Sequence, residues 1–466
     1  MANSPQTNAE WLELGSKYTL RHPMKTHASL VPERGDGIYM WDVEGNRYMD
    51  FMAGQLCVSL GHTHPEYVEA IKDQADKMIQ AGTTFSVPSE ILLAKKIAEV
   101  APDPLQRSLF ACTGSESNEM AFRLAKKATG RSETVSVAQN YHGSTMGSAS
   151  AGGMGGYWRE GYGPFVSGGC VVPLPYYYRL PMCLDGASES EADDMLLAIT
   201  EDLIDASTTG RPATFILEPL MAGAGMLVPS DKWMRGIRKL CTERGMMMIM
   251  DEALTGIGRT GRWFCFEHFD IVPDIVTTSK GLGGGVPICA ITTSDEITER
   301  ALANGFMHFS SHSGDPLLCA PALRNLEIIE RDGLVQHVEE VGAHFLRELK
   351  RMEQEYEIVG EARGLGLVLG LETVMDKKSR EPNQDAAYDI AQYCFEHGLW
   401  LTNIRPQKSP EESKEFHRYF PMNIVRLMPP MVVTKEQVDE ALEIFEGGVR
   451  YAQERTPRPA SVAVGG

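Results

Sequence analysis

The sequence predicts an α/β fold built on a mostly parallel sheet, in a chain of two or three domains. Its 466 residues are too many for one compact hydrophobic core. Short apolar runs alternate with helical stretches, which indicates buried strands joined by crossover helices. Polar residues cluster just after several of these strands, at the sheet edge where open α/β proteins bind their ligands.

Residues 1–70 are predicted to form an N-terminal segment with a β-hairpin. Two runs of β-forming residues, 37–42 and 47–51, flank a turn-prone Glu-Gly-Asn. A helix is predicted over about 65–78, where apolar residues recur at helical spacing.

Residues 71–325 are predicted to form a large domain that contains the parallel sheet. Its strands are expected at 108–111, 134–138, 215–217, 246–250, 275–278 and 288–293. A helix is expected over 120–128, after the first of these strands.

Residues 326–456 are predicted to form a small α/β domain, followed by a flexible tail at 457–466. A strongly helical stretch leads into this domain, and shorter strands and helices follow it. The expected segments are helix over 315–356, strand at 366–372, helix at 386–397, loop at 403–421, strand at 424–427 and helix at 435–453.

Composition and charge exclude several classes of function. The formal net charge of −19 disfavours a nucleic-acid partner, which would need clustered Lys and Arg. The nine cysteines show no metal-binding or C-x-x-C spacing, which indicates reduced thiols in a cytoplasmic protein. The N-terminus resembles no signal or transit peptide, and no apolar run is long enough to span a membrane.

Lys280 and Asp251 are the two strand-end residues with the most distinctive chemistry. Lys280 precedes a glycine-rich run, and a lysine held near a carbonyl group can form a Schiff base. Asp251 follows a buried strand, where a carboxylate is costly unless a cation such as a protonated pyridine nitrogen meets it. Taken singly, Lys280 also fits a surface lysine, and Asp251 also fits a helix N-cap or a salt-bridged loop residue.

Two further segments complete a possible binding site for a flat anionic group. Thr113, Gly114 and Ser115 precede a helix, so hydroxyls and backbone N–H groups there can cradle a phosphate. The alternative is a helix cap in which Ser115 pairs with a residue at 118 or 119. Tyr141 follows a strand and can stack on a ring, although core packing of Tyr141 and a satisfied buried His142 are the simpler alternatives. The ordered set is far more specific than any member.

At this point the chain resembles the class III aminotransferases, a pyridoxal-phosphate-dependent family. The family pattern Asp-Glu-x-x-x-Gly-x-Gly-Arg-Thr-Gly matches residues 251–261. Ser-Lys-Gly at 279–281 and Thr-Gly-Ser-Glu-Ser-Asn-Glu at 113–119 also match. So do Gly-His-x-His-Pro at 61–65 and Arg-Gly-x-Gly at 363–366. The resemblance spans roughly residues 34–446 and implies the aspartate-aminotransferase-like (type I) fold, with a large and a small domain.

Within that family the chain is most similar to the 2,2-dialkylglycine decarboxylase group. The matching motifs lie at 51–55, 60–62, 137–143, 311–317 and 426–430. The resemblance therefore implies decarboxylation of a 2,2-dialkylglycine such as 2-aminoisobutyrate, coupled to transamination of a keto acid.

The resemblance also assigns a role to each candidate site residue. Lys280 carries the cofactor and shuttles the proton, and Asp251 pairs the pyridinium nitrogen. Arg426 binds the substrate carboxylate, and Gln55 holds the carboxylate that leaves. The other implied cofactor contacts are Thr113, Gly114, Ser115, Tyr141, His142, Glu218 and Ser311, the last from a partner subunit.

The resemblance extends to a cation and to self-association. An alkali cation, K⁺ or Na⁺, is implied beside the site, with Thr83, Ser311 and Asp315 among its ligands. Because sites in this family form at a dimer interface, a homodimer is expected, with a tetramer as the larger alternative. The other implied partners are small amino-acid and keto-acid substrates.

Four departures from the family pattern bear on the substrate. Leu254 stands where the family usually has Gln; the decarboxylase group has Trp, Met and Ser where this chain has Tyr141, Ser144 and Ala222. Leu254 and Tyr141 favour an alternative on the same scaffold, namely a non-decarboxylating ω-amino or amine transaminase, or an amino-acid racemase. A non-enzymatic binding protein is the third hypothesis, and the intact Lys280 argues against it.

Overall fold

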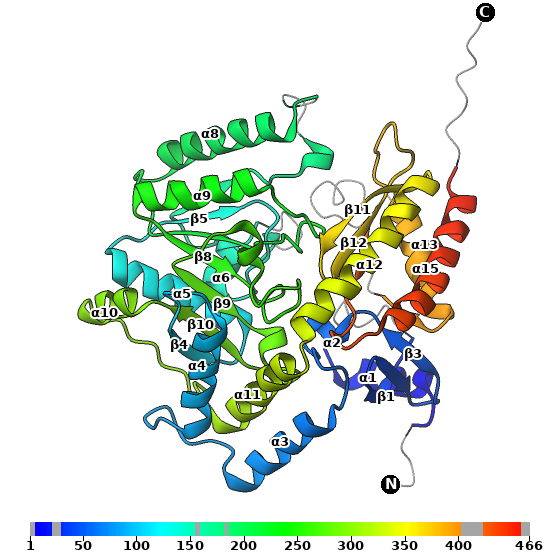
Figure 1. Ribbon diagram of the computed structural model, residues 1–466, viewed down its shortest axis with the longest axis horizontal. Coiled ribbons are helices and arrows are strands. Elements are labelled where there is room, and N and C mark those ends of the chain that lie inside the picture. The colour runs from blue at the N-terminus through cyan, green and yellow to red at the C-terminus, as the bar shows by residue number, and fades with distance from the viewer. Residues whose placement is uncertain are drawn as a thin grey trace, which may run out of the picture.

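The computed structural model describes residues 5–20, 29–153, 159–180, 184, 186–401 and 423–457. The middle of the chain forms one body around a large sheet, and the two ends of the chain form a smaller body beside it (Figure 1). The fold is α/β, as the sequence predicts, and the polar strand ends of the large sheet position the site.

The large sheet has seven strands in the order β4-β10-β9-β8-β7-β5-β6. β10 runs antiparallel to both of its neighbours, and the other neighbouring pairs are parallel. All six predicted strands are confirmed, and β6, at the sheet edge, is an addition. The strands are β4 (Arg107–Ala111), β5 (Thr134–Val137), β6 (Gly169–Val172), β7 (Thr214–Leu217), β8 (Met247–Asp251), β9 (Ile275–Thr278) and β10 (Cys289–Thr293).

Helices connect and cover these strands. The helix after β4 begins at Gly114 and not near residue 120, because Thr113 caps it in a reciprocal capping box with Glu116. The alternative that made Ser115 the cap is therefore wrong. The helical elements of this body are α4 (Pro88–Val100), α5 (Gly114–Thr129), α6 (Met146–Ala151), η2 (Tyr177–Arg179), α8 (Glu189–Ser207), α9 (Asp231–Arg244), η4 (Cys265–Phe269), η5 (Lys280–Leu282) and α10 (Asp295–Ala303).

The N-terminal hairpin and the C-terminal part of the chain share a sheet. The predicted hairpin is confirmed, since β2 and β3 pair antiparallel, and β13 extends this sheet parallel to β3. The predicted helix near 65–78 is also confirmed. The elements are α1 (Asn8–Tyr18), β1 (Pro32–Asp36), β2 (Tyr39–Asp42), β3 (Arg47–Asp50), α2 (Ala53–Leu56), α3 (Pro65–Lys77) and β13 (Leu399–Trp400).

The C-terminal part packs helices on a three-stranded antiparallel sheet with the order β11-β12-β14. The predicted helical stretch divides in two, because Gly333 adopts a left-handed φ of 63° before the second helix. The elements are α11 (Pro316–Arg331), α12 (Leu334–Glu355), β11 (Val359–Leu365), β12 (Val368–Thr373), α13 (Gln384–Glu396), β14 (Ile424–Leu427) and α15 (Lys435–Arg455). The predicted loop at 403–421 and tail residues 458–466 lie outside the described residues.

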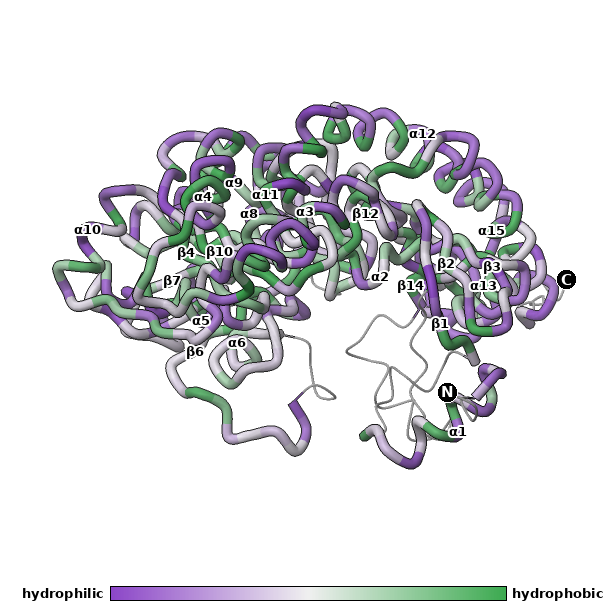
Figure 2. The backbone as a smooth tube through the Cα atoms, turned by 90° about the horizontal axis from the view of Figure 1, so that it is seen from below, coloured by the Kyte–Doolittle hydropathy of each residue, from purple (hydrophilic) through white to green (hydrophobic). Residues whose placement is uncertain are grey.

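The hydrophobic core follows the strands and the inward faces of the helices. All positions of β7, β8, β9, β10 and β12 are buried. Hydrophobic and hydrophilic residues alternate along the turns of α12, as expected for a helix with one buried face (Figure 2). Within the described part of the chain, no helix combines the length and the apolar character needed to cross a membrane.

Candidate active site

A cavity of about 350 Å³ opens where strands of the large sheet end and α5 begins. Its lining comes from the segments that follow β4, β5, β8 and β9, together with Cys57 from the N-terminal part. The predicted residues Thr113, Gly114, Ser115, Tyr141, His142, Asp251 and Lys280 all line it. Segments far apart in the sequence therefore meet at one place, as the strand-end argument predicts.

Asp251, the last residue of β8, is a buried carboxylate with 4% of its surface exposed. Its Oδ2 lies 2.8 Å from both His142 Nδ1 and Asn118 Nδ2. Its Oδ1 accepts a hydrogen bond from the Ala253 backbone N–H at 3.1 Å, and the Thr277 hydroxyl oxygen lies 3.4 Å from it. The predicted alternative of a helix N-cap is not what the structure shows, because Asp251 ends a strand.

These contacts keep Asp251 ionised. Burial opposes the charge, but the hydrogen bonds from His142 and Asn118 outweigh it and lower the pKa of Asp251. Because a carboxylate only accepts, His142 Nδ1 must carry the proton. His142 Nε2 is buried and has no hydrogen-bond partner among the described residues. The site thus holds a negative charge that a ring cation would complement.

The N-terminus of α5 faces the same cavity and suits an anion. Its first backbone N–H groups lack helical acceptors, and the helix dipole favours negative charge there. The hydroxyl of Ser115 accepts the Ser144 N–H at 3.0 Å, which fixes the loop that follows Tyr141. A Cβ on Gly143 would lie 2.3 Å from this hydroxyl, so the loop requires glycine there. Phosphate-sized anions fit this combination of N–H groups and hydroxyls.

Lys280 and Tyr141 contribute the amine and the aromatic ring. Lys280 is partly buried directly after β9 and has a φ of 36°, a strained value for a residue with a side chain. The Tyr141 side chain is 38% exposed, so it belongs to the cavity and not to the core, and its hydroxyl lies 3.0 Å from the Ser144 hydroxyl. An amine, a flat ring and an anion cradle thus line one cavity.

Glu218 and Arg426 lie near the cavity without being among its lining residues. Glu218, 6% exposed, accepts the Tyr141 and Ala222 backbone N–H groups at 2.7 and 3.2 Å. Burial raises the pKa of Glu218 to about 7. Arg426 is partly buried on β14; burial lowers its pKa, and the charge of Glu218 opposes that change. The two side chains therefore interact across the two bodies.

The remaining predicted residues are not brought to the cavity of a single chain. Gln55 is exposed, and Cys57 is the residue of its segment that lines the cavity. Ser311 is exposed in the loop before α11, where its carbonyl accepts Gln80 Nε2 at 3.0 Å.

The proposed cation ligands remain a prediction. Thr83 is half-buried between α3 and α4. The Asp315 carboxylate is buried and lies 2.5 Å from His312 Nδ1. Within the described ranges, no group of three or more His, Cys, Asp or Glu side chains is placed to hold a metal ion. An alkali cation bound by hydroxyls and carbonyls would not depend on such a group.

Asn118, Thr277 and Cys57 are among the residues in or beside the site to which the sequence assigned no role. Asn118 bonds Asp251, and Thr277 donates to Asn118 Oδ1 at 2.9 Å, which completes a buried polar network. Cys57 lines the cavity from the N-terminal part. Asn118 stood within a recognised motif, so its helix position relative to Thr113 could have suggested an inward face. Thr277 and Cys57 carried no such signal.

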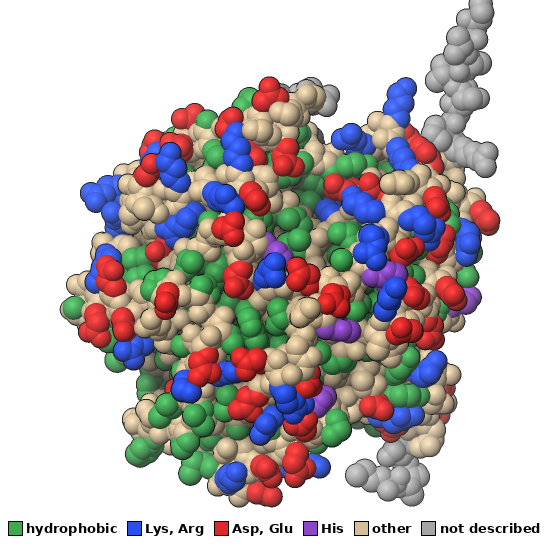
Figure 3. Space-filling model, in the orientation of Figure 1, with side chains coloured by type: hydrophobic (Ala, Val, Ile, Leu, Met, Phe, Trp, Pro, Cys, Tyr) green, Lys and Arg blue, Asp and Glu red, His purple; other side chains and the backbone are tan. Residues whose placement is uncertain are grey.

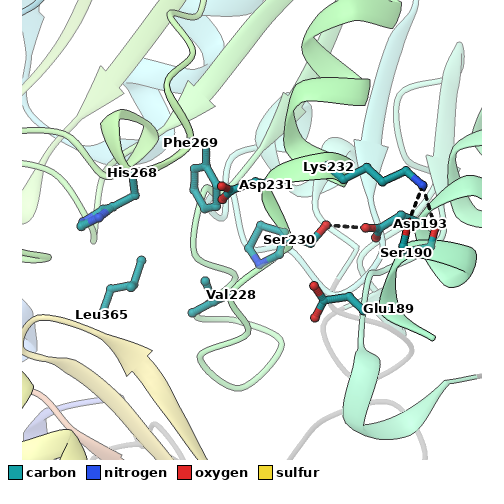
Figure 4. Close-up of a pocket in the computed structure, with 11 residues that line it drawn as sticks. Glu189, Ser190, Asp193, Val228, Ser230, Asp231, Lys232, His268, Phe269 and Leu365 are labelled. Carbon is teal, nitrogen blue, oxygen red and sulfur yellow. Dashed lines mark hydrogen bonds between the residues drawn. The ribbon is translucent and has the colours of Figure 1, made fainter.

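A second, larger cavity of about 670 Å³ contains none of the predicted residues. It lies at the N-termini of α8 and α9 (Figure 4), and its best buried carboxylate, Asp193, already accepts the hydroxyls of Ser230 and Tyr177 at 2.5 and 2.6 Å. Lys232 there bonds Ser190 and forms an ion pair with Asp194. Its polar groups are therefore satisfied within the fold, and we assign the chemistry to the smaller cavity.

The chain belongs to the class III aminotransferases, because the family model Aminotransferase class-III matches residues 21–449. Pyridoxal phosphate is the cofactor of this family, and its members act on small amino acids and keto acids. The lining suits that cofactor: the α5 N-terminus offers N–H donors for a phosphate, Asp251 offers a negative charge for a protonated ring nitrogen, and Lys280 offers an amine that could condense with an aldehyde.

Individual relatives indicate which reactions are carried out by proteins similar to this chain. The chain is 32% identical to a probable 4-aminobutyrate aminotransferase of Bacillus subtilis, over 95% of this chain and 98% of that protein. It is 31% identical to a leucine/methionine racemase of Thermococcus litoralis, over 92% of each. An (S)-enantioselective omega-transaminase of Thermomicrobium roseum superimposes with a TM-score of 0.86 at 31% identity, over 97% of this chain and 100% of that one. These relatives support the non-decarboxylating alternative better than decarboxylation.

Proposed function

We propose that this protein is a pyridoxal-phosphate-dependent transaminase that removes a proton, and not carbon dioxide, from a carboxylate-bearing amino donor. The observation that carries the proposal is the lining of the cavity. Lys280, the base expected to move the proton, lines it, whereas Gln55, the residue expected to hold a leaving carboxylate, is exposed outside it.

The proposal assigns a role to each of the main groups that line the cavity. The N-terminus of α5 and Ser115 bind the phosphate, and Tyr141 stacks against the ring. Asp251 would pair the ring nitrogen and keep it protonated. The bound cofactor would supply an electron sink for the pair left at the substrate carbon. Lys280 would take the proton from that carbon and deliver it to the carbon of the former aldehyde group.

Arg426 supports a substrate that carries a carboxylate. A guanidinium offers paired donors that match a carboxylate, and the partial burial of Arg426 strengthens such a contact. The Glu218 carboxylate attracts the same guanidinium. Arg426 therefore already interacts with one anionic side chain before a substrate binds. Both α-amino acids and ω-amino acids satisfy this requirement.

A substrate panel tests the proposed reaction. The holoprotein would be given α-amino acids, 4-aminobutyrate and 2-aminoisobutyrate, each with pyruvate, and scored for alanine, carbon dioxide and inversion of the donor. Alanine formation without carbon dioxide supports the proposal. Carbon dioxide equal to alanine from 2-aminoisobutyrate would instead establish the decarboxylase. Inversion without alanine would establish a racemase.

We also propose that the active form is a homodimer. A set of strongly exposed apolar side chains, here called the apolar patch, consists of Met78, Ile79, Phe85, Met307 and Phe309. Hydrophobic side chains appear at the lower left of the face shown, over the segment that joins α3 to α4 (Figure 3). The bond between Gln80 and the Ser311 carbonyl joins the two loops that carry the patch. A second copy placed there would cover the patch and bring its Ser311 toward the phosphate.

A further inference from the structure

The backbone turn that precedes Cys57 has strained dihedral angles, which contacts from other residues must stabilise. In α2 the residues Ala53, Gly54 and Leu56 have φ values of 48°, 67° and 58°. Residues with a Cβ rarely adopt this left-handed region, because the side chain crowds the backbone carbonyl. Two such residues within four positions persist only where surrounding contacts enforce them.

Asp50 makes those contacts. Its Oδ1 accepts the Met52 N–H at 2.9 Å, and its Oδ2 accepts the Gly54 N–H at 2.7 Å. Only 1% of Asp50 is exposed, and the bond to Met52 is buried, whereas the bond to the exposed Gly54 is partly buried. The carboxylate therefore clamps the turn at its first residues.

His62 orients the Asp50 carboxylate. His62 Nε2 lies 2.8 Å from Asp50 Oδ2, and it must donate because the carboxylate only accepts. The backbone of His62 exchanges two hydrogen bonds with Gly37, at 2.7 and 3.1 Å. A Cβ on Gly61 would lie 2.6 Å from the Gly37 carbonyl oxygen, which explains why glycine precedes the histidine. The cofactor chemistry makes no use of this Gly-His pair.

The clamped turn reaches the candidate active site on two sides. Cys57 lines the cavity, and its Sγ lies 3.4 Å from the Gln55 carbonyl oxygen. Two residues further on, Ser59 donates to the Gly281 carbonyl at 3.4 Å and accepts the Met431 N–H at 2.9 Å. The segment after Asp50 thus connects the loop of Lys280 with the loop that follows β14.

We propose that Asp50, oriented by His62, is a positioning residue for the reaction at Lys280. It fixes the turn 53–56 and so places Cys57, which lines the cavity, relative to the bound substrate. Asp50 does not touch the reacting atoms itself. The proposal rests on the proposed function insofar as it takes the Lys280 cavity as the place of reaction.

The test compares Asp50→Asn with Asp42→Asn. Asp42 is an equally buried carboxylate of the same sheet, and it holds the hairpin turn by accepting the N–H groups of Glu44 and Asn46 at 3.0 and 2.8 Å. Three quantities would be measured: the yellow Schiff-base absorbance at Lys280, kcat and KM for transamination, and the rate at which iodoacetamide alkylates Cys57. Mass spectrometry of the Cys57 peptide reports that rate, with Cys112 as an internal reference because it lines the same cavity from β4.

The expected result separates the two variants. Asp50→Asn should keep the absorbance, lower kcat by about ten- to a hundredfold and raise Cys57 alkylation severalfold, because small misplacements at a reacting centre are costly. Cys112 alkylation and all properties of Asp42→Asn should stay near the wild type. Unchanged kcat and unchanged Cys57 alkylation in Asp50→Asn would overturn the proposal.

A second pair of variants decides the matter if Asp50→Asn does not fold. His62→Gln retains an N–H donor near the position of Nε2, whereas His62→Ala removes it. The proposal expects His62→Ala to lower kcat and expose Cys57, and His62→Gln to restore both; equal behaviour of the two variants would contradict it. If the wild type never forms the Lys280 absorbance, the proposed function fails, but Cys57 alkylation still tests the clamp.

Discussion

Asp251 shows how a single buried charge defines the chemistry of a cavity. His142, Asn118 and Thr277 surround it with donors, and the lowered pKa keeps it ionised at neutral pH. In the proposed reaction, it would stabilise a positive charge on the ring nitrogen of the cofactor. An amide of the same size would remove that stabilisation, and its NH2 group would face donors at one of the two oxygen positions.

We therefore expect Asp251→Asn to fold and to lose about 10²- to 10³-fold in kcat for transamination, the cost typical of removing one electrostatic stabiliser. Glu252→Gln is the matched control, because Glu252 is the adjacent buried carboxylate and does not line the cavity. Steady-state kinetics of both holoproteins would check this. Similar kcat values for the two variants would show that Asp251 has no electrostatic role.

The raised pKa of the adjacent Glu252 predicts how the free energy of unfolding depends on pH. It is 1% exposed, accepts the Phe266 N–H at 2.9 Å, and burial raises its pKa to about 7. Between its ordinary pKa near 4.5 and about 7, the unfolded chain loses this proton while the folded chain keeps it. The contribution of Glu252 to the stability of the folded state therefore falls as the pH rises from about 4.5 to about 7. Above that range this contribution is constant.

The variant Glu252→Gln removes this cost. The variant's free energy of unfolding minus that of the wild type should be larger by about 3 kcal/mol at pH 8 than at pH 4.5, so the variant is relatively more stable at pH 8, since one pKa unit corresponds to about 1.4 kcal/mol. Urea unfolding of both proteins at the two pH values measures this difference. An offset between the proteins that does not change with pH would refute the assignment of the raised pKa to Glu252.

The sequence could predict roles for residues that stand at the end of an apolar strand. Lys280 and Asp251 belong to this group, because a charged residue after an apolar run demands an explanation. Asn118 and Thr277 could not be predicted in the same way. Their roles depend on which face of α5 turns toward the sheet and on the pairing of β8 with β9, and both are settled only by packing.

At the scale of elements, the start of α5 combines a structural cap with the proposed phosphate site. Thr113 accepts the Glu116 N–H, and Glu116 reaches back to the Thr113 N–H. The same box exists at α8, where Ser188 and Glu191 satisfy each other away from the cavity. The two caps thus share one structural role, and only that of α5 faces the proposed phosphate.

We expect Thr113→Ala and Ser188→Ala to lower the stability of the apoprotein by similar amounts, about 1 kcal/mol each. Only Thr113→Ala should also weaken the binding of pyridoxal phosphate, because it alone loses a hydroxyl beside the anion. Urea unfolding and titration with the cofactor measure the two effects separately. Equal cofactor affinities in the two variants would remove Thr113 from the phosphate site.

Two strands that the sequence did not predict, β6 and β11, lack a continuous apolar run. β6 alternates exposed and buried positions over only four residues at the sheet edge, so it lacks a continuous apolar run. β11 contains Glu361 and Arg363, whose charges suggest a loop. In the structure these two side chains form an ion pair at 2.5 Å, and Arg363 forms a second one with the buried Glu372. These ion pairs offset the cost of placing charged residues in a strand.

At the scale of the whole molecule, the two ends of the chain form one body. β13 pairs with β3, and Phe51 and Met428 are joined by a backbone hydrogen bond of 2.8 Å. Arg426 and the segment after Asp50 therefore approach the Lys280 cavity from the same body. Sequence periodicity could not reveal this, because the pairing joins residues more than three hundred positions apart.

The apolar patch supplies the last prediction, since it lies on loops next to the cavity. Phe309 is 73% exposed, and burying such a side chain against a second copy is favourable by about 2 kcal/mol. Phe309→Asp should therefore shift the protein toward a monomer and lower its activity, because Ser311 of the second copy would no longer reach the phosphate. Met195→Glu, on the exposed side of α8, is the control for adding a charge at an exposed apolar position. Light scattering after size-exclusion chromatography, combined with a transamination assay, would check both. A dimeric Phe309→Asp with full activity would place the interface elsewhere, whereas a monomer with full activity would show that each chain holds a complete site.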